Sequence, residues 1–144
     1  MRVLTLRQPW ASLIALGHKK IETRSWRTDY RGPLLIHAAK TFSSEERLFA
    51  SEERSFGRIG ARLPLQAIVC KAVLVDCQPT EEASLTASGL EKRLGNFLPR
   101  RFAWFLEHVE PLTEPVPCIG CLGLWKPSAD VLESVEQVIF AKGV

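Results

Sequence analysis

The sequence lacks any apolar run close to the roughly twenty residues that a helix needs to cross a bilayer. Its longest apolar stretch, residues 67–75, is interrupted by Lys71. The first ten residues also lack the pattern of a secretory signal, because Arg2 and then Arg7 and Gln8 precede any small-residue cleavage site. These absences argue against an integral membrane protein, and we expect a cytoplasmic location with no membrane partner.

Residues that bind metal ions are also scarce. The three histidines, His18, His37 and His108, show no HxH or HxxxH spacing. Of the four cysteines, Cys118 and Cys121 have the spacing of half a zinc site, but the seven-residue separation of Cys70 and Cys77 predicts opposite faces of one strand. The glycines form neither familiar phosphate-binding loop, and there is no local signature of a serine or cysteine triad. We predict reduced thiols, no metal site and no cofactor.

Length and composition are those of an ordinary globular protein. A chain of 144 residues with 46% hydrophobic and 24% charged residues predicts a single domain spanning 1–144, which we expect to be a monomer.

The charge is unevenly distributed. Residues 2–40 contain eight Lys or Arg and two acidic residues, a net charge of +6 within a chain whose total is +3. A solvated charged face explains such an imbalance, and so does a polyanionic partner.

Hydrophobic periodicity and turn residues predict an α+β fold. Pro9 and Gly17 bracket a first helix, Ser43 and Glu46 form a capping box, and Ser128 caps an amphipathic C-terminal helix. We predict a mixed five- to six-stranded β-barrel, closed or nearly closed, with peripheral helices. The predicted strands are 2–6, 19–26, 33–39, 66–78, 101–112 and 119–126, with an extended 113–118 segment, and the predicted helices are 9–16, 43 toward Arg54, one starting at Thr80, and 128–142.

Chemically versatile side chains concentrate in the first forty residues. Alternation along residues 19–26 puts Glu22, Arg24 and Trp26 on one face of a strand, while Lys19 lies in the preceding turn. Lys19 and Arg24 are candidate phosphate contacts, next to the N-terminal end of the first helix at Gln8, Pro9 and Trp10. Trp10 or Trp26 offers a plane for base stacking, and Glu22 could accept a hydrogen bond from a base amine or orient Arg24.

This cluster resembles the ASCH domain, a PUA-like family that includes the ASCH domain of activating signal cointegrator and small bacterial ASCH proteins. The resemblance rests on QPWASL at residues 8–13, on RGPLLIHAAK at 31–40, and on Gly17, Lys19, Glu22, Arg24 and Trp26 in the spacing GxKxxExRxW. It implies a PUA-like barrel with a cleft near the first helix and a role in binding RNA or DNA. Some similar bacterial members hydrolyse acetylated cytidine and others are ribonucleases. Lys19 falls on the catalytic lysine of the former, whereas Glu22 stands where those enzymes have a threonine.

Three functional hypotheses follow. The first is a module that binds RNA, single-stranded nucleic acid or a nucleotide in a basic cleft. The second is a small hydrolase of acetylated cytidine or RNA, in which Lys19 and Glu22 are catalytic and proximity to Arg24 and partial burial lower the pKa of Lys19. The third is a protein-interaction module that uses the C-terminal helix. The candidate ligand-binding residues are Gln8, Pro9, Trp10, Lys19, Glu22, Arg24, Trp26 and His37.

Each candidate also has a structural interpretation. Glu22 and Arg24 could form only an ion pair, Trp10 could anchor its helix in the core, and His37 could be a hydrogen-bonded packing residue.

Overall fold

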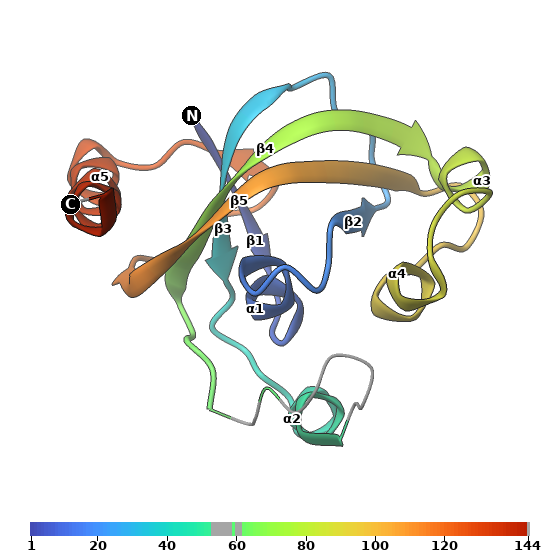
Figure 1. Cartoon of the computed structure of the whole chain (residues 1–144), viewed down its shortest axis with the longest axis horizontal. Coiled ribbons are helices and arrows are strands. Elements are labelled where there is room, and N and C mark those ends of the chain that lie inside the picture. The colour runs from blue at the N-terminus through green and yellow to red at the C-terminus, as the bar shows by residue number, and fades with distance from the viewer. Residues whose placement is uncertain (53–58, 60–61, 144) are drawn as a thin grey trace.

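Six strands form one mixed sheet in a computed structural model that describes residues 1–52, 59 and 62–143 (Figure 1). The strands are β1 (Arg2–Leu6), β2 (Ile21–Arg24), β3 (Gly32–Ala38), β4 (Ala67–Pro79), β5 (Phe102–Pro117) and β6 (Leu124–Trp125). The helices are α1 (Trp10–Ala15), α2 (Ser44–Glu52), α3 (Thr80–Ala83), α4 (Gly89–Leu94) and α5 (Ala129–Gly143). The predicted α+β class and the strand number are therefore confirmed.

The sheet is curled but open. Its order is β2-β5-β4-β3-β1-β6, in which β1 and β3 are parallel and the other neighbours are antiparallel. Because β2 and β6 occupy the two ends of this order, the sheet forms a half-barrel, and the closed barrel allowed by the sequence is not formed. The curled sheet arches over α1, which packs against β3, β4 and β5 (Figure 1).

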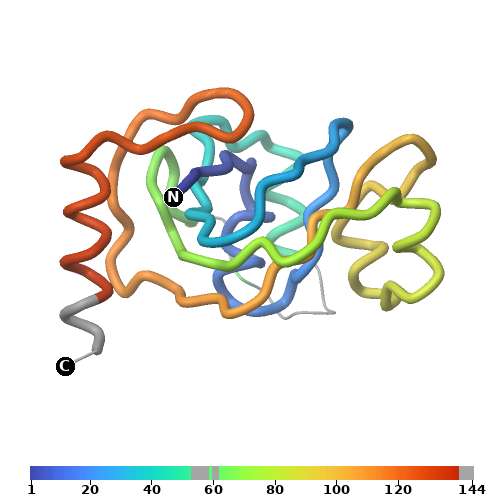
Figure 2. Tube along the Cα trace, turned by 90° about the horizontal axis from the view of Figure 1, so that it is seen from above, coloured from blue at the N-terminus to red at the C-terminus, as the bar shows by residue number. Residues whose placement is uncertain are grey.

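The two faces of the sheet are covered by different helices. Ala11 and Ile14 of α1 join the main core with alternate residues of the strands, among them Leu4, Leu34 and Ile36. Val3 and Leu35, one position along, face the other way. They pack against α5, which lies at one end of the molecule while α3 and α4 lie at the other (Figure 2).

Local signals in the sequence locate most helix ends. Gly17 has φ +84° just after α1, and its N–H donates to the carbonyl of Ile14, as expected of a residue that closes a helix. The capping box is confirmed, since Glu46 N donates to Ser43 Oγ and Ser43 N donates to the Glu46 carboxylate. Ser128 accepts from Val131 N at the start of α5. The predicted end of the second helix near Arg54 lies outside the described residues.

Three strand predictions were wrong in length. The strand expected at 19–26 is only Ile21–Arg24. The proline-rich residues 113–117 belong to β5, and the last strand is only Leu124–Trp125. The prolines are tolerated because β2 pairs only with residues 102–105 of β5, so beyond that point β5 pairs with β4 on one side alone. The helix expected from Thr80 is two short helices, α3 and α4.

Register irregularities in β4 overturn the expectation that Cys70 and Cys77 lie on opposite faces. The pairing of β4 with β5 shifts at three places, and between Leu74 and Asp76 the extra residue is in β4, which turns Cys77 to the face of Cys70. Cys70 is therefore buried in the main core, and Cys77 packs against the same cluster.

No helix in the described part of the chain is long and apolar enough to span a bilayer.

Candidate functional site

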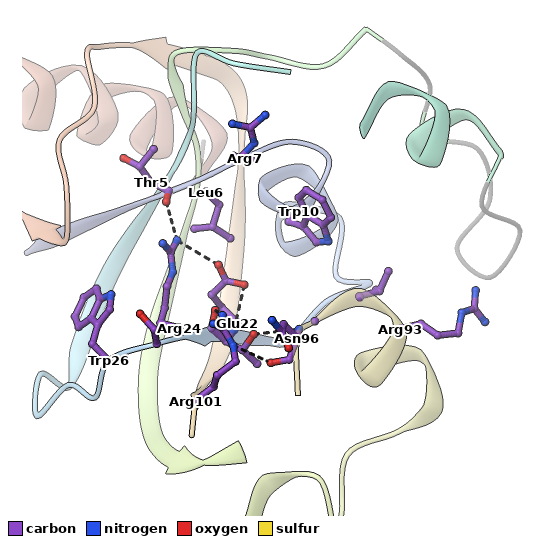
Figure 3. A pocket seen from close by; sticks show the side chains of 14 residues that line it. Thr5, Leu6, Arg7, Trp10, Glu22, Arg24, Trp26, Arg93, Asn96 and Arg101 are labelled. Carbon is purple, nitrogen blue, oxygen red and sulfur yellow. Dashed lines mark hydrogen bonds and ion pairs between the residues drawn. The ribbon is translucent and has the colours of Figure 1, made fainter. Parts of the chain in front are cut away.

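A pocket of about 540 Å³ opens between α1, β2 and the segment around α4 (Figure 3). Four arginines and one carboxylate are among the residues that line it, so its charge is predominantly positive. Trp10 and Trp26 lie on opposite sides of the central Glu22 and Arg24 (Figure 3). The lining residues are Thr5, Leu6, Arg7, Trp10, Glu22, Thr23, Arg24, Ser25, Trp26, Arg93, Leu94, Gly95, Asn96 and Arg101.

Glu22 lies between two cations. Its carboxylate is 3.2 Å from Arg24 Nη2 and 3.6 Å from Lys19 Nζ. Its side chain is 13% exposed, and that of Arg24 is 25% exposed. The expectation that Glu22 and Arg24 share one side of the strand is confirmed by their ion pair, and Trp26 lines the same pocket. We call Lys19, Glu22 and Arg24 the charged cluster.

Lys19 is the buried member of the charged cluster. Its side chain is fully inaccessible, and Nζ donates to the carbonyls of Ile21 at 2.6 Å and Leu94 at 2.9 Å. Burial lowers the pKa of Lys19, opposed by the carboxylates of Glu22 and Glu91, while Arg24 lowers it further by a smaller amount. The predicted direction of this shift is confirmed. However, the ammonium group joins β2 to α4 behind the pocket and is not presented to a ligand.

In the described part of the chain, the interactions of the Arg24 guanidinium are made by one nitrogen, Nη2. Its Nη2 donates to the carbonyl of Thr5 at 2.7 Å, which ties β2 to β1 across the open side of the half-barrel. Among the described residues, Arg24 Nε is the buried side-chain polar atom without a hydrogen-bond partner. The Arg24 side chain is 25% exposed and lines the pocket, so the accessible part of its guanidinium fits an anionic ligand.

The opposite wall of the pocket comes from α4 and the loop after it. Arg101 donates to the carbonyls of Asn96 and Thr23, both at 3.2 Å, and Asn96 N donates to Thr23 Oγ1. Arg93 belongs to α4. Sequence reasoning missed this wall because it lies about seventy residues from β2 in the chain and carries no motif. Arg7, which also lines the pocket, was counted only as part of the basic segment.

The outer edge of β2 is closed by α4. The Glu91 carboxylate accepts from the backbone N–H groups of Lys20 at 2.6 Å and Ile21 at 3.2 Å. Side chains thus replace the missing neighbour strand, which removes an exposed edge and fixes the orientation of Glu22 and Arg24.

Two of the N–H groups in the first turn of α1 are already occupied. Ser12 N donates to Gln8 Oε1 at 2.9 Å, and Ala11 N donates to the carbonyl of Arg7 at 3.3 Å. The amide of Gln8 also donates to Ser12 Oγ and to the carbonyl of Pro64. Gln8 and Pro9 are therefore buried residues that shape the entry to α1, and neither lines the pocket.

Trp10 and Trp26 combine packing and exposure. The Trp10 ring stacks on Phe49 with 6.2 Å between centroids, and the Trp26 ring meets Trp104 edge-on at 4.7 Å. Both indoles are only partly buried and both line the pocket. Each is anchored on one side and can contact a ligand on another.

His37 does not belong to the pocket. It projects from β3 on the face of Leu35, away from α1, because Leu34 and Ile36 supply the face that α1 covers. It is 1% exposed, with Nδ1 3.1 Å from Thr5 Oγ1 and Nε2 2.7 Å from the carbonyl of Cys118. Its packing interpretation is the one that the structure supports.

Within the described ranges 1–52, 59 and 62–143, no group of three or more His, Cys, Asp or Glu residues could hold a metal ion. The side chains that line the pocket offer guanidinium donors, one carboxylate, two indole rings, and the hydroxyl and amide groups of Thr5, Thr23, Ser25 and Asn96. Such a set binds anions and planar groups.

The fold and the pocket together define a PUA-like domain: a curled mixed sheet around a short helix, with a basic pocket beside that helix. A crystal structure of ASCH from Zymomonas mobilis has this fold, with a TM-score of 0.60 at 11% identity over 94% of this chain and 93% of that one. Two variants of that Zymomonas protein score 0.59 and 0.58.

The family model described as "ASCH domain" matches residues 4–116, and the chain belongs to this family. Human activating signal cointegrator 1 is 52% identical over 44 residues, which are 30% of this chain and 8% of that protein. The mouse protein of the same name is 54% identical over 35 residues, 24% of this chain and 6% of that protein. The matched segments thus span less than a tenth of these curated relatives.

Proposed function

We propose that this protein binds RNA or a nucleotide through the basic pocket beside α1. The observation that carries the proposal is the lining of the pocket, which includes four arginines, a single carboxylate and two partly exposed indoles. Guanidinium groups neutralise phosphates, and indole rings stack on bases. The ASCH family as a whole is linked to RNA binding, which supports the same ligand class.

Arg24 is the proposed central phosphate contact. Its Nη2 is held by Thr5 and Glu22, whereas Nε has no partner within the described part of the chain. Because the side chain is 25% exposed and lines the pocket, the accessible part of the guanidinium can donate to a ligand phosphate. Glu22 would then orient Arg24 more than it contacts the ligand, because its own oxygens already accept from Arg24 and Thr23 and lie near Lys19.

The test is titration of an unstructured oligoribonucleotide over a series of salt concentrations. We expect binding that weakens as salt rises, and about tenfold weaker binding for Arg24→Gln, from the loss of a charged hydrogen bond. Arg27→Gln is the matched control, since Arg27 is exposed, paired with Asp29 and outside the pocket. Absence of binding at low salt, or equal affinity in both variants, would refute the proposal.

A hydrolase is the second candidate, favoured by a buried lysine with a lowered pKa beside a carboxylate. In this reading Lys19 acts as base or nucleophile on acetylated cytidine or RNA, with Glu22 assisting. It requires Lys19 Nζ to leave the carbonyls of Ile21 and Leu94. Release of cytidine from acetylated cytidine, or cleavage of RNA, no faster with wild type than with Lys19→Met would remove it.

The protein-interaction hypothesis rested on an uncovered apolar face of the C-terminal helix, and that face is covered. Val135 of α5 is buried, and Val131 and Ile139 pack against the same cluster as Val3 and Leu35. The apolar face of α5 is thus covered by its own sheet, and no partner is needed to explain it.

We also propose that residues 1–144 act as one domain, as a monomer, in the cytoplasm. The main core, which joins α1 to strands β1, β3, β4 and β5, supports a single unit. Light scattering that gives a mass near 16.2 kDa and one unfolding transition would agree with it.

A further inference from the structure

A neutral hydrogen-bond chain runs behind the pocket on the α5 face of the sheet. A carbonyl can only accept, so His37 Nε2 carries the proton that bonds the Cys118 carbonyl at 2.7 Å. Nδ1 is then an acceptor for the Thr5 hydroxyl at 3.1 Å. The same hydroxyl oxygen accepts from Trp125 Nε1 at 3.1 Å. We call His37, Thr5, Trp125 and the Cys118 carbonyl the neutral chain.

Thr5 connects the neutral chain to the charged cluster. Its hydroxyl lies in the neutral chain, while its carbonyl accepts from Arg24 Nη2 at 2.7 Å in the pocket (Figure 3). A change in the hydrogen bonding of one group of Thr5 therefore acts on the residue that also holds Arg24.

The ring of His37 has little freedom to move. A Cβ atom at Gly120 would lie 2.7 Å from His37 Cε1, 2.8 Å from Nδ1 and 2.8 Å from Thr5 Oγ1, so the backbone of this loop presses directly on the pair. The Trp125 ring meets the imidazole edge-on, with 5.7 Å between centroids. A change in the protonation of His37 must be accommodated by its hydrogen-bond partners, because rotation of the ring is blocked.

We propose that His37 is a positioning residue for the pocket, and that its protonation alters the placement of Arg24 through the hydroxyl and carbonyl groups of Thr5. A proton on Nδ1 turns that atom from acceptor to donor, so the Thr5 hydroxyl loses its acceptor and must reorient. The consequence for ligand affinity rests on the proposed function. The coupling of His37 to Arg24 does not.

The charged and titratable groups around His37 are few in the described residues. The loop after β5 brings Cys118 and Cys121, and burial raises the pKa of Cys118, so it stays a neutral thiol over the range concerned. β1 and β6 bring the neutral Thr5 and Trp125, and β2 brings Arg24 beyond Thr5. Burial also lowers the pKa of His37, so the neutral form persists at neutral pH and the change occurs below pH 6.5.

The coupling can be measured without any ligand. NMR titration of the intact protein follows His37 Cε1–H and the Arg24 Nε–H signal as pH falls. We expect both signals to move with one apparent pKa, and the Arg24 response to vanish in Thr5→Val, which removes the hydroxyl and keeps the carbonyl. An Arg24 signal that ignores the titration of His37, or that follows it equally in Thr5→Val, would overturn the proposal.

The second readout is the affinity of the protein for an oligoribonucleotide at different pH values. The oligoribonucleotide lacks terminal phosphates, so that no phosphate group of the ligand titrates in this range. Between pH 7.5 and 5.0 we expect wild-type affinity to fall about three- to tenfold, the range expected for one hydrogen bond. In His37→Asn, which keeps an acceptor near Nδ1, the ratio of the affinities at pH 7.5 and 5.0 should fall to about one, whatever the affinity at pH 7.5. A variant that only damaged the fold would weaken binding at every pH.

The outcomes separate the two proposals. If wild type binds equally at both pH values, the positioning role is wrong and the proposed function stands. If no binding occurs at any pH, the proposed function fails, and the NMR titration alone decides on the coupling of His37 to Arg24.

Discussion

The charged cluster and the neutral chain are two polar groups buried in one small sheet, and they differ in charge and in access. The charged cluster has two basic residues and one acidic residue, of which Glu22 and Arg24 line an open pocket while Lys19 is enclosed. The neutral chain is built of uncharged groups enclosed between the sheet and the loop after β5. A buried group that only supports the fold can be neutral, whereas retaining charges at a cost in desolvation points to a ligand of opposite charge.

Thr5 links the charged cluster and the neutral chain directly. Its hydroxyl and carbonyl bond to the two clusters separately, so the neutral chain supports the residue that holds Arg24. We expect the charged cluster and the neutral chain to differ in how much they contribute to the free energy of unfolding and in the pH range over which they contribute. Both contributions can be compared with that of an ion pair at the rim of the pocket.

The largest effect on stability is expected from Lys19→Met. The change leaves the buried carbonyls of Ile21 and Leu94 without their donor, which should lower the free energy of unfolding by about 3 kcal/mol. Urea unfolding measures it. Lys20→Met, at the exposed neighbouring position, should change the value by less than about 0.5 kcal/mol. A similar small loss for Lys19→Met would mean that its hydrogen bonds contribute nothing.

The two clusters should stabilise the protein in different pH windows. The lowered pKa of His37 means that the unfolded chain binds more protons below pH 6.5, so stability falls as pH drops through that region. The lowered pKa of Lys19 means that stability rises with pH between that pKa and 10.5, where the unfolded lysine is still protonated.

Unfolding free energies measured across pH test both windows. His37→Asn should flatten the acidic slope alone, and Lys19→Met should flatten the alkaline slope alone. An acidic slope that is unchanged in His37→Asn would contradict the assignment of a neutral buried histidine.

The smallest effect is expected at the rim, where Arg7 donates twice to Glu46 at 2.6 and 2.7 Å. This pairing lowers the pKa of Glu46 to about 2, so its stabilisation is present above about pH 4.5 and is lost as pH falls toward 2. Because Arg7 is 49% exposed, we expect Glu46→Gln to cost only about 1 kcal/mol at pH 7. Thermal unfolding would show this, with the exposed Glu45→Gln as the control. A loss as large as that of Lys19→Met would refute the ranking.

Much of the fold could be predicted from the sequence, and so could four of the fourteen residues that line the pocket. Strand alternation placed Glu22, Arg24 and Trp26 together, and the same alternation put His37 opposite Leu34 and Ile36. The structure shows that α1 covers the face of Leu34 and Ile36, so His37, which the sequence analysis kept as a ligand-binding candidate, faces away from the pocket.

The rest depended on tertiary structure. Arg93 and Arg101 reach the pocket from a segment distant in sequence, and β-strand pairing alone brings it there. The role of Gln8 as a cap was hidden because a glutamine has many possible partners. Bulges in β4 altered which cysteines face the core, and single-sequence periodicity does not reveal them.

The most direct test of the central claim follows the four tryptophan indole N–H signals by NMR while an unstructured oligoribonucleotide is added at low salt. Trp10 and Trp26 line the basic pocket, whereas α5 lies at the far end of the molecule (Figure 2). We predict that the Trp10 and Trp26 signals shift in proportion to occupancy, while the amide signals of α5 do not. Shifts centred on α5, or indole signals that stay in place while binding occurs, would contradict the assignment of the pocket as the binding site.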